Sequence, residues 1–550
     1  MGHTSLSCAL VLALVAGVGG ASHTPPAFSA GASGDSALSP RDSARHALNR
    51  LAYGPRPGDV DRIAAGGVKR WIDAQLDPAR IDDAALEARE RAAPVLRYSR
   101  ADLAKVYADA LRERRAAAGR TPLTMSDTEP TPGPRERVGR RLANQYVDLT
   151  IERAVLSRRQ LYEVVVDFWT NHFNVLMAKG ADRFLLPDYV EHAIRPHAFG
   201  RFSDLLIATA ESPAMLFYLD NWESVAPGSQ PPGARRALRF GLDARADSAR
   251  RAALARLPRG LNENYARELL ELHTLGVDGG YTQTDVVNVA RIFTGWSIER
   301  PQQGGGFTFR DWAHDYGSKV VLGMDFPAGH GQDEGIRLLQ WLANAPGTMH
   351  HVSRELCQRF VRDEPPDGCV DDAVAAWRRT GGDISAVLRA IVEGPDFWAP
   401  ASMDTKVKTP LAFLVSALRV TDAQPDTSLR LPQVLVRLGE PLFMHTAPDG
   451  YPDSASAWIN SGALLDRMSI AVALAADRLP GARVDLDELV GAVSDPAGLV
   501  AEVNARILAG TMSPNTARVI RDEISEMPNP RAARAFAVGL AVGGPEFQRR

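Results

Sequence analysis

Carboxylates, a histidine and amides are concentrated in residues 262–296, NENYARELLELHTLGVDGGYTQTDVVNVARIFTGW, a segment that otherwise predicts two helices. On the first helix, Asn264, Glu268 and Glu271 fall within about 60° of one another at 100° per residue. Glu268 and Glu271 are therefore candidate general bases, and Asn264 is a candidate substrate-binding residue. His273 points about 160° away from Glu271 on a regular helix, so the two cannot form a Glu-x-x-His metal face. His273 is a further candidate substrate-binding residue.

A structural explanation of the same segment is also open. The carboxylates could be solvated or paired with arginines, and His273 could sit favourably at the C-terminus of the first helix. The second helix begins at Thr282, a good N-cap with Asp285 at N3, which gives Asp285 a sufficient structural role. Arg291 on this helix is a candidate for holding an anion or a carboxylate.

Residues 161–177, LYEVVVDFWTNHFNVLM, predict an upstream helix whose apolar side carries a histidine. His172 falls beside Phe168 and Trp169, and a buried histidine needs a partner for each ring nitrogen. It is either a satisfied core residue or a catalytic acid or its orienting group. Asn171 lies on a separate polar stripe and is a candidate substrate-binding residue.

The sequence HDYGSK at 314–319 predicts a tight turn. Asp315 and Gly317 are good turn formers, although Asp315 is also a candidate for substrate binding. His314 and Lys319 have no such structural reason. They are candidate catalytic residues that could supply an acid, a base or an anion contact.

The elements that must position these residues are mainly helical. The pattern predicts one large helical domain over residues 41–550 with at least one small β-hairpin at about 304–323. Residues 116–137 predict a mobile loop, and residues 224–260 an Arg- and Pro-rich insertion. The chain has no GxSxG elbow, no Walker loop, no GxGxxG after a strand and no HExxH.

The N-terminus predicts export. Residues 1–21 have the apolar run and small residues of a signal peptide, and residues 22–40 predict a flexible linker. After cleavage only Cys357 and Cys369 remain, and they could form a disulfide or stay as buried thiols. No later run is long enough to span a membrane. The formal net charge of −3 gives no overall attraction for nucleic acid.

Several segments together make the chain similar to a known bacterial family. The pieces HALNRLAYGPRPGDVDRIAAGGVKRWIDAQL, DFWTNHFNV, LNENYARELLELHTLGVDGGYTQTDVVNVARIFTGW, HDYGSKVVLG and GPEFQ resemble the family called domain of unknown function 1800 (DUF1800). They occur in order through nearly the whole predicted mature chain. The resemblance implies an exported protein often encoded beside a sulfatase-like family, domain of unknown function 1501. It assigns no catalytic roles, because the family has no established reaction.

Taken together, the sequence predicts an exported helical protein with a polar site. This site would be built from the helix at 167–172, the helix at 264–273 and the HDxGxK turn at 314–319. Glu268 or Glu271 would act as the base and His172 or His314 as the acid, while Lys319 and Arg291 would hold an anionic group. The reaction class would be a hydrolase or transferase acting on an envelope component or polymer. No metal ligands are assigned, although the carboxylates and one histidine could hold a divalent ion. The alternative is a non-catalytic scaffold or binding partner of a sulfatase-like exported protein.

Overall fold

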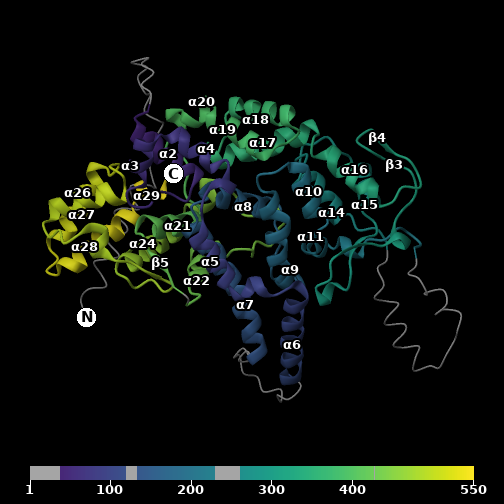
Figure 1. The fold of residues 1–550 in the computed structure, drawn as a ribbon, viewed down its shortest axis with the longest axis horizontal. Helices are drawn as coiled ribbons and strands as arrows, with labels where there is room; N and C mark the ends of the chain where they lie inside the picture. The colour runs from purple at the N-terminus through teal and green to yellow at the C-terminus, as the bar shows by residue number, and fades with distance from the viewer. Residues whose placement is uncertain (1–37, 119–132, 230–259, 427) are drawn as a thin grey trace.

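The computed structural model describes residues 38–118, 133–229, 260–426 and 428–550 (Figure 1). The predicted signal peptide, residues 1–21, and most of the predicted linker, residues 22–40, lie outside these ranges. The middle of the predicted loop 116–137 and nearly all of the predicted insertion 224–260 also lie outside them. The first described helix begins at Pro40, one residue before the predicted start of the helical domain.

Helices form most of the described chain, as the sequence predicts (Figure 1). The first part holds α2 (Pro40–Leu51), α3 (Asp59–Gly66), α4 (Val68–Gln75), α5 (Ala84–Ala92), α6 (Arg100–Ala118), α7 (Pro134–Leu156), α8 (Gln160–His172), α9 (Asp182–Tyr189), α10 (Phe202–Ala210) and α11 (Pro213–Tyr218). The middle holds α14 (Asn264–Glu271), α15 (Gln283–Ile292), α16 (Gln332–Leu342), α17 (Pro346–Phe360), α18 (Asp367–Thr380), α19 (Ile384–Glu393) and α20 (Pro395–Trp398). The last part holds α21 (Pro410–Val420), α22 (Leu431–Leu438), α23 (Ala455–Trp458), α24 (Ser461–Ala475), α25 (Leu486–Val490), α26 (Pro496–Ile507), α27 (Pro514–Ser525), α28 (Pro530–Gly543) and α29 (Pro545–Gln548).

Many helix starts are encoded by a capping side chain followed directly by proline. The side chain accepts a hydrogen bond from a free backbone N–H of the first turn, and proline at the first position needs no such bond. The capping residues of this kind are Ser39, Ser212, Thr409, Asp495, Ser513 and Asn529. Helix α15 starts with the predicted capping box, in which Thr282 and Asp285 each accept from the other's backbone.

The small sheets confirm a mainly α fold with β-hairpins, but the strands near 304–323 pair differently from the prediction. Strand β2 (Phe307–Phe309) pairs with the upstream β1 (Trp296–Ile298), and β3 (Lys319–Val321) pairs with the downstream β4 (Met324–Phe326). Strands β2 and β3 do not pair with each other, and the chain between them contains a 3-10 turn at Asp311–Ala313. A third pair joins β5 (Gln424–Pro425) and β6 (Ala482–Arg483).

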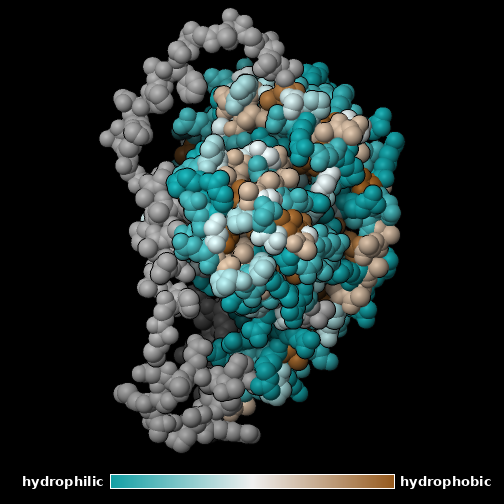
Figure 2. Space-filling view, turned by 90° about the vertical axis from the view of Figure 1, so that its left-hand side faces the viewer, coloured by the Kyte–Doolittle hydropathy of each residue, from teal (hydrophilic) through white to brown (hydrophobic). Residues whose placement is uncertain are grey.

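One large hydrophobic core includes side chains from α2 near the N-terminus to α29 near the C-terminus. Helices α6 and α7 pack against each other as a hairpin that projects from the rest of the molecule (Figure 1). On the side drawn in Figure 2, hydrophilic residues predominate and hydrophobic residues are scattered in small groups. No helix among the described residues is long and apolar enough to cross a membrane.

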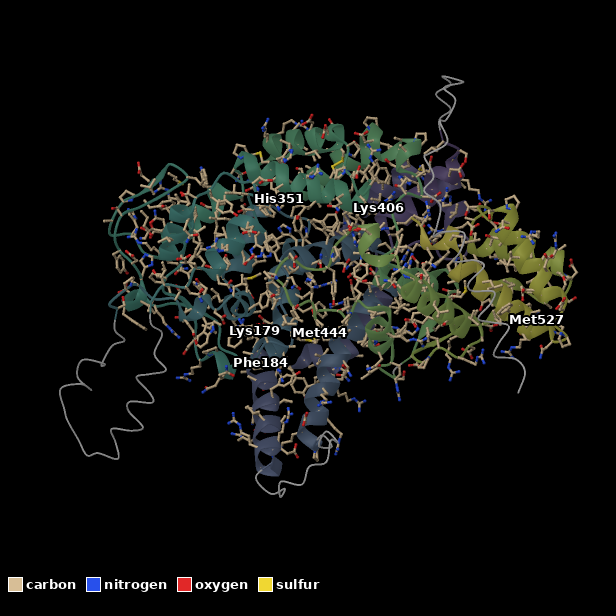
Figure 3. The ribbon with its side chains drawn as sticks, turned by 180° about the vertical axis from the view of Figure 1, so that it is seen from behind. Lys179, Phe184, His351, Lys406, Met444 and Met527 are labelled. Atoms are coloured by element: carbon tan, nitrogen blue, oxygen red, sulfur yellow. A yellow bond between two sulfur atoms is a disulfide. The ribbon has the colours of Figure 1, made fainter. Side chains whose placement is uncertain are left out.

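Cys357 and Cys369 form a disulfide, which is one of the two alternatives left open by the sequence. Cys357 on α17 is bonded to Cys369 on α18, twelve residues later (Figure 3). Both residues are buried in the core. The bond therefore fixes α17 against α18, and α17 carries side chains into the cavity described below.

Candidate functional site

A cavity of about 340 Å³ lies where α7, α8, α14 and α17 meet the start of α21 and the loop 440–454. Polar side chains on its wall include Glu163, Asp167, Asn171, His172, Glu271, His351, Glu355, Gln358, Arg359, Glu440, Asp449 and Asp453. Aromatic side chains also line it, among them Phe168 and Tyr451. The cavity thus joins residues from across the sequence around one hollow.

A histidine–carboxylate pair forms one wall of the cavity. His172 Nδ1 lies 2.7 Å from Glu355 Oε2, and His172 Nε2 lies 3.3 Å from the backbone oxygen of His273. The imidazole is buried and packs beside Phe168, Trp169 and Phe173, as the sequence predicts for the first two. A carbonyl oxygen and an ionised carboxylate both only accept, so each ring nitrogen of His172 donates in the hydrogen bond that it forms.

His351 lies on the other side of the same carboxylate, near the centre of the molecule (Figure 3). Its Nε2 is 3.5 Å from Glu355 Oε1 and 3.3 Å from the backbone oxygen of Leu272. Burial lowers the pKa of His351 despite the nearby Glu355. The ring also touches the turn after α14, because a Cβ on Gly276 would be 3.0 Å from His351 Nδ1. Gly276 has φ +87°, a conformation that favours glycine, and the nearby ring leaves little room for a side chain.

Glu355 therefore sits between two histidines and still faces open space. Its side chain keeps 34% of its surface accessible, whereas that of His172 keeps 3%. Burial opposes the charge on Glu355, but the charge of His172 and its hydrogen bond lower the pKa of the carboxyl overall. The result is an ionised carboxylate presented to the cavity.

Asn171 orients the loop that closes one side of the cavity. Its Nδ2 donates to Tyr451 O at 2.8 Å, and its Oδ1 accepts from Tyr451 N at 2.7 Å. A Cβ on Gly450 would lie 2.4 Å from the Asn171 backbone oxygen, so only glycine fits there with φ +70°. The predicted substrate-binding residue Asn171 lines the cavity, but both its polar atoms are used to hold the loop.

Ion pairs fill the deeper wall. Arg359 Nη2 donates to Asp167 at 2.8 Å, and its Nη1 is 3.5 Å from Asp453. Buried Lys406 donates to Asp363 at 2.6 Å and lies 3.3 Å from Asp453. Burial opposes the charge of Asp453, yet Lys406, Arg359 and other cations lower its pKa to about 2. These groups neutralise one another within the wall.

The pKa of Glu440 shifts in the opposite direction from that of Asp453. Its Oε2 accepts from Leu411 N at 2.6 Å, and burial raises the pKa of its carboxyl to about 7. The wall therefore carries carboxyls that are held ionised, Glu355 and Asp453, and one, Glu440, that titrates near neutral pH. Carboxyl groups with pKa values pushed apart in this way can serve as base and acid.

Of the two glutamates predicted on α14 as candidate bases, only Glu271 lines the cavity. Glu271 lines it and lies 3.5 Å from the Tyr281 hydroxyl. Glu268 is half-buried and does not line it, and burial together with the charge of Glu271 raises its pKa. Asn264 is exposed and donates to Leu219 O at 3.3 Å. His273 is buried behind His172, where burial and the His172 charge lower its pKa to about 3.

The residues of the HDYGSK turn and Arg291 lie away from the cavity. Arg291 holds Asp315 through two hydrogen bonds of 2.7 and 3.2 Å. Lys319 is buried and donates to Glu334 at 2.7 Å. His314 Nδ1 lies 2.8 Å from the backbone oxygen of Thr294. These contacts join the turn to α15 and α16, so the turn does not join the two helices around the cavity as the sequence predicts.

Several cavity residues are absent from the sequence-based prediction, chiefly Glu355, His351 and Glu440. A usable signal is present on α17, PGTMHHVSRELCQRF, where His351, Glu355 and Arg359 recur every four residues and share one face. The downstream segment GYPDSASAW, with its aromatic and acidic residues, also contributes, because Tyr451 to Ser454 line the cavity.

In the described part of the chain, no group of three or more His, Cys, Asp and Glu side chains is arranged to hold a metal ion. Searches of curated proteins and of solved structures found no match to this chain. A comparison with protein families matches residues 46–549 to "Protein of unknown function (DUF1800)". That match covers nearly the whole chain and agrees with the predicted resemblance, so the protein belongs to the DUF1800 family.

Proposed function

We propose that the protein is an acid–base enzyme, a hydrolase or transferase, whose reaction takes place at Glu355 in the cavity. The observation that carries this proposal is the position of Glu355, which lies deep in the fold between His172 and His351 and keeps a third of its side chain open to the cavity. A carboxylate needed only for packing has no reason to face an open space. An oriented, ionised carboxylate there can act as a general base.

The chemistry follows from the two kinds of carboxyl on the wall. Glu355 accepts a proton from a water molecule or from an acceptor hydroxyl as that oxygen attacks the substrate. Glu440, protonated near neutral pH, donates a proton to the departing oxygen. After the step Glu355 is protonated and Glu440 ionised, and exchange with solvent restores both. His172 and His351 hold the Glu355 carboxylate in place.

The substrate is a neutral or cationic, hydroxyl-bearing polymer. Seven Asp and Glu side chains line the cavity against three arginines, so even with a proton on Glu440 an anionic substrate would meet repulsion. Phe168 and Tyr451 offer aromatic faces beside the carboxylates. Neutral saccharide chains present both hydroxyls and flat C–H surfaces and fit this lining. The predicted anion contacts, Arg291 and Lys319, are already paired with Asp315 and Glu334 elsewhere.

We also propose that the protein acts after export. The disulfide between Cys357 and Cys369 supports this, because such bonds persist in oxidising compartments. The N-terminal sequence MGHTSLSCALVLALVAGVGGAS supports it independently.

The experiment is a screen of the purified protein against neutral polysaccharides and their ester derivatives, with product release as the readout. Glu355→Gln should reduce the rate by at least 100-fold while the variant stays folded, as circular dichroism verifies. Glu526→Gln is the matched control, because Glu526 is an exposed glutamate remote from the cavity lining. A Glu355→Gln variant that keeps the full rate would rule out this site.

A second function, a non-catalytic scaffold or partner of a sulfatase-like exported protein, has its own supporting observation. Arg195 donates to both carboxylate oxygens of Glu163 at 2.9 Å, and buried Lys319 is paired with Glu334 at 2.7 Å, as packing residues are. If the protein is a scaffold, Glu355→Gln would change its stability or its binding to a partner. No enzymatic activity would be lost, because there would be none. The same screen with a melting curve therefore separates the two functions.

A further inference from the structure

The projecting hairpin of α6 and α7 carries a dense group of exposed arginines at its tip. We define the hairpin tip as residues 111–118 of α6 and 133–141 of α7. Its seven arginines are all exposed: Arg112, Arg114, Arg115, Arg135, Arg137, Arg140 and Arg141. Only Glu113 and Glu136 oppose them, which leaves a net charge of +5.

Neighbouring acids neutralise only part of this charge. Asp109 lies next to Arg112 and is 3.4 Å from Arg135, and Arg140 donates to Glu136 at 2.8 Å. Arg114, Arg115 and Arg141 form no ion pair with any residue that the structure describes. These three guanidinium groups are therefore available to a partner with negative charge.

Apolar side chains lie at the same level of the hairpin. Leu111 keeps 49% of its surface exposed and Val138 keeps 46%. The contacts of Arg135 with Asp109 and Glu113 place residues 109–113 of α6 beside the start of α7. The tip therefore combines cations with two exposed hydrophobic side chains, which suits the boundary between lipid headgroups and acyl chains.

The rest of the molecule has the opposite charge. Residues 111–141 carry +4 when the segment between the helices is counted, whereas the whole chain carries −3, so the remainder carries −7. An anionic surface attracts the tip and repels the body. The approach is then tip first, along the direction in which the hairpin projects (Figure 1).

We propose that the hairpin tip docks on the surface of an anionic phospholipid bilayer. Clusters of four to eight basic residues bind such surfaces through the summed attraction of their charges. Leu111 and Val138 enter the headgroup region, while the long arginine side chains reach phosphates around them. This inference does not depend on the chemistry proposed for the cavity.

Docking would also fix the height of the cavity above the surface. Helix α7 is continuous from the tip to the cavity, whose wall includes its residues Thr150, Arg153 and Ala154. Nine residues separate Arg141 from Thr150, which corresponds to about 14 Å along a helix. The cavity would thus be held close to the membrane without touching it.

The test is a flotation or sedimentation assay of the purified full chain with two kinds of vesicle. One kind contains phosphatidylcholine alone, and the other contains about 30% phosphatidylglycerol. The chain should bind the anionic vesicles at least tenfold more tightly at low salt and lose this preference at about 0.5 M NaCl. Equal binding to both vesicles, or none to either, would overturn the proposal.

Variants locate the binding at the tip. The triple variant Arg114→Ala, Arg115→Ala, Arg141→Ala should weaken binding about 100-fold, and lysine at the same positions should keep it. The matched control is Arg378→Ala, Arg379→Ala, Arg531→Ala, which removes three exposed arginines from other surfaces. Equal loss in both triples would overturn the proposal. Tip arginines that matter for double-stranded DNA but not for vesicles would also overturn it. Circular dichroism verifies that each variant is folded.

Discussion

Glu355 on α17 and His172 on α8 are joined by a contact of 2.7 Å, although 183 residues separate them in the chain. The contact ties together two helices that carry four of the ten Asp, Glu and Arg side chains on the cavity wall. It also gives the carboxylate a fixed direction, with one oxygen toward His172 and the other toward His351.

Gly276 is expected to be needed because of its contact with His351. Gly276→Ala forces a side chain into φ +87° and brings Cβ to 3.0 Å from His351 Nδ1. We expect a loss of about 2–3 kcal/mol in the free energy of unfolding, from backbone strain and the displaced ring. Urea denaturation followed by circular dichroism measures this loss.

The control for that variant is Gly280→Ala in the same connection. Gly280 has φ +75°, but a Cβ there meets nothing within 4 Å. It should cost about 1 kcal/mol, since only the strain remains. Equal losses for the two alanine variants would mean that the His351 contact has no energetic weight.

Asn171 is expected to hold the loop of Tyr451. Asn171→Ala removes two hydrogen bonds to the Tyr451 backbone and leaves its N–H and C=O without those partners. The loss in unfolding free energy should be about 1–3 kcal/mol. Hydrogen exchange of the Tyr451 amide should accelerate at least tenfold, whereas Asn344→Ala, in the connection just after α16, should leave it unchanged. An unchanged amide in Asn171→Ala would show that other contacts hold the loop.

The stability of the fold is expected to depend on pH through His273. Burial keeps the pKa of His273 at about 3 in the folded protein, against about 6.5 when unfolded. Between these values the unfolded chain binds a proton that the folded chain does not. Stability therefore falls as the pH falls below 6.5, by about 1.4 kcal/mol per pH unit from this residue.

A variant isolates this contribution from those of other groups. His273→Leu should lose less stability than the natural chain between pH 6.5 and 4.5, by about 2 kcal/mol. Guanidinium denaturation of both proteins at several pH values gives the difference. Parallel pH profiles would contradict the low pKa of the buried imidazole.

The features predicted correctly from the sequence depend on nearby residues. Thr282 and Asp285 form a capping box because each is within three residues of the other. The burial of His172 follows from its place on the apolar side of one helix. By contrast, α14 ends at Glu271 rather than continuing toward Gly276, so a regular helix does not describe the direction of His273.

Features that depend on distant residues could not be predicted in this way. Nothing near His172 in the sequence indicates that its partner is Glu355, and nothing near Lys319 indicates Glu334 on α16. Strand pairing failed for the same reason, since the chain between β2 and β3 was compatible with more than one partner. The predicted catalytic roles of Glu268, Glu271, His314 and Lys319 stay predictions.

The disulfide is expected to stabilise the helix that carries Glu355. Replacing Cys357 and Cys369 with serine opens a loop closed across twelve residues. The free energy of unfolding should fall by about 3 kcal/mol. Dithiothreitol should destabilise the natural chain by a similar amount and leave the serine variant unchanged. A natural chain that is insensitive to the reductant would indicate that the bond contributes little.

The most direct test of the account is the ionisation of Glu355 itself. In protein labelled with ¹³C at glutamate carboxyls, the resonance absent from Glu355→Gln identifies this residue during a pH titration. The account predicts that the carboxyl titrates below its ordinary pKa of 4.5, and that His172→Gln moves the titration to higher pH. A Glu355 carboxyl that titrates at or above 4.5 and does not respond to His172→Gln would contradict the account.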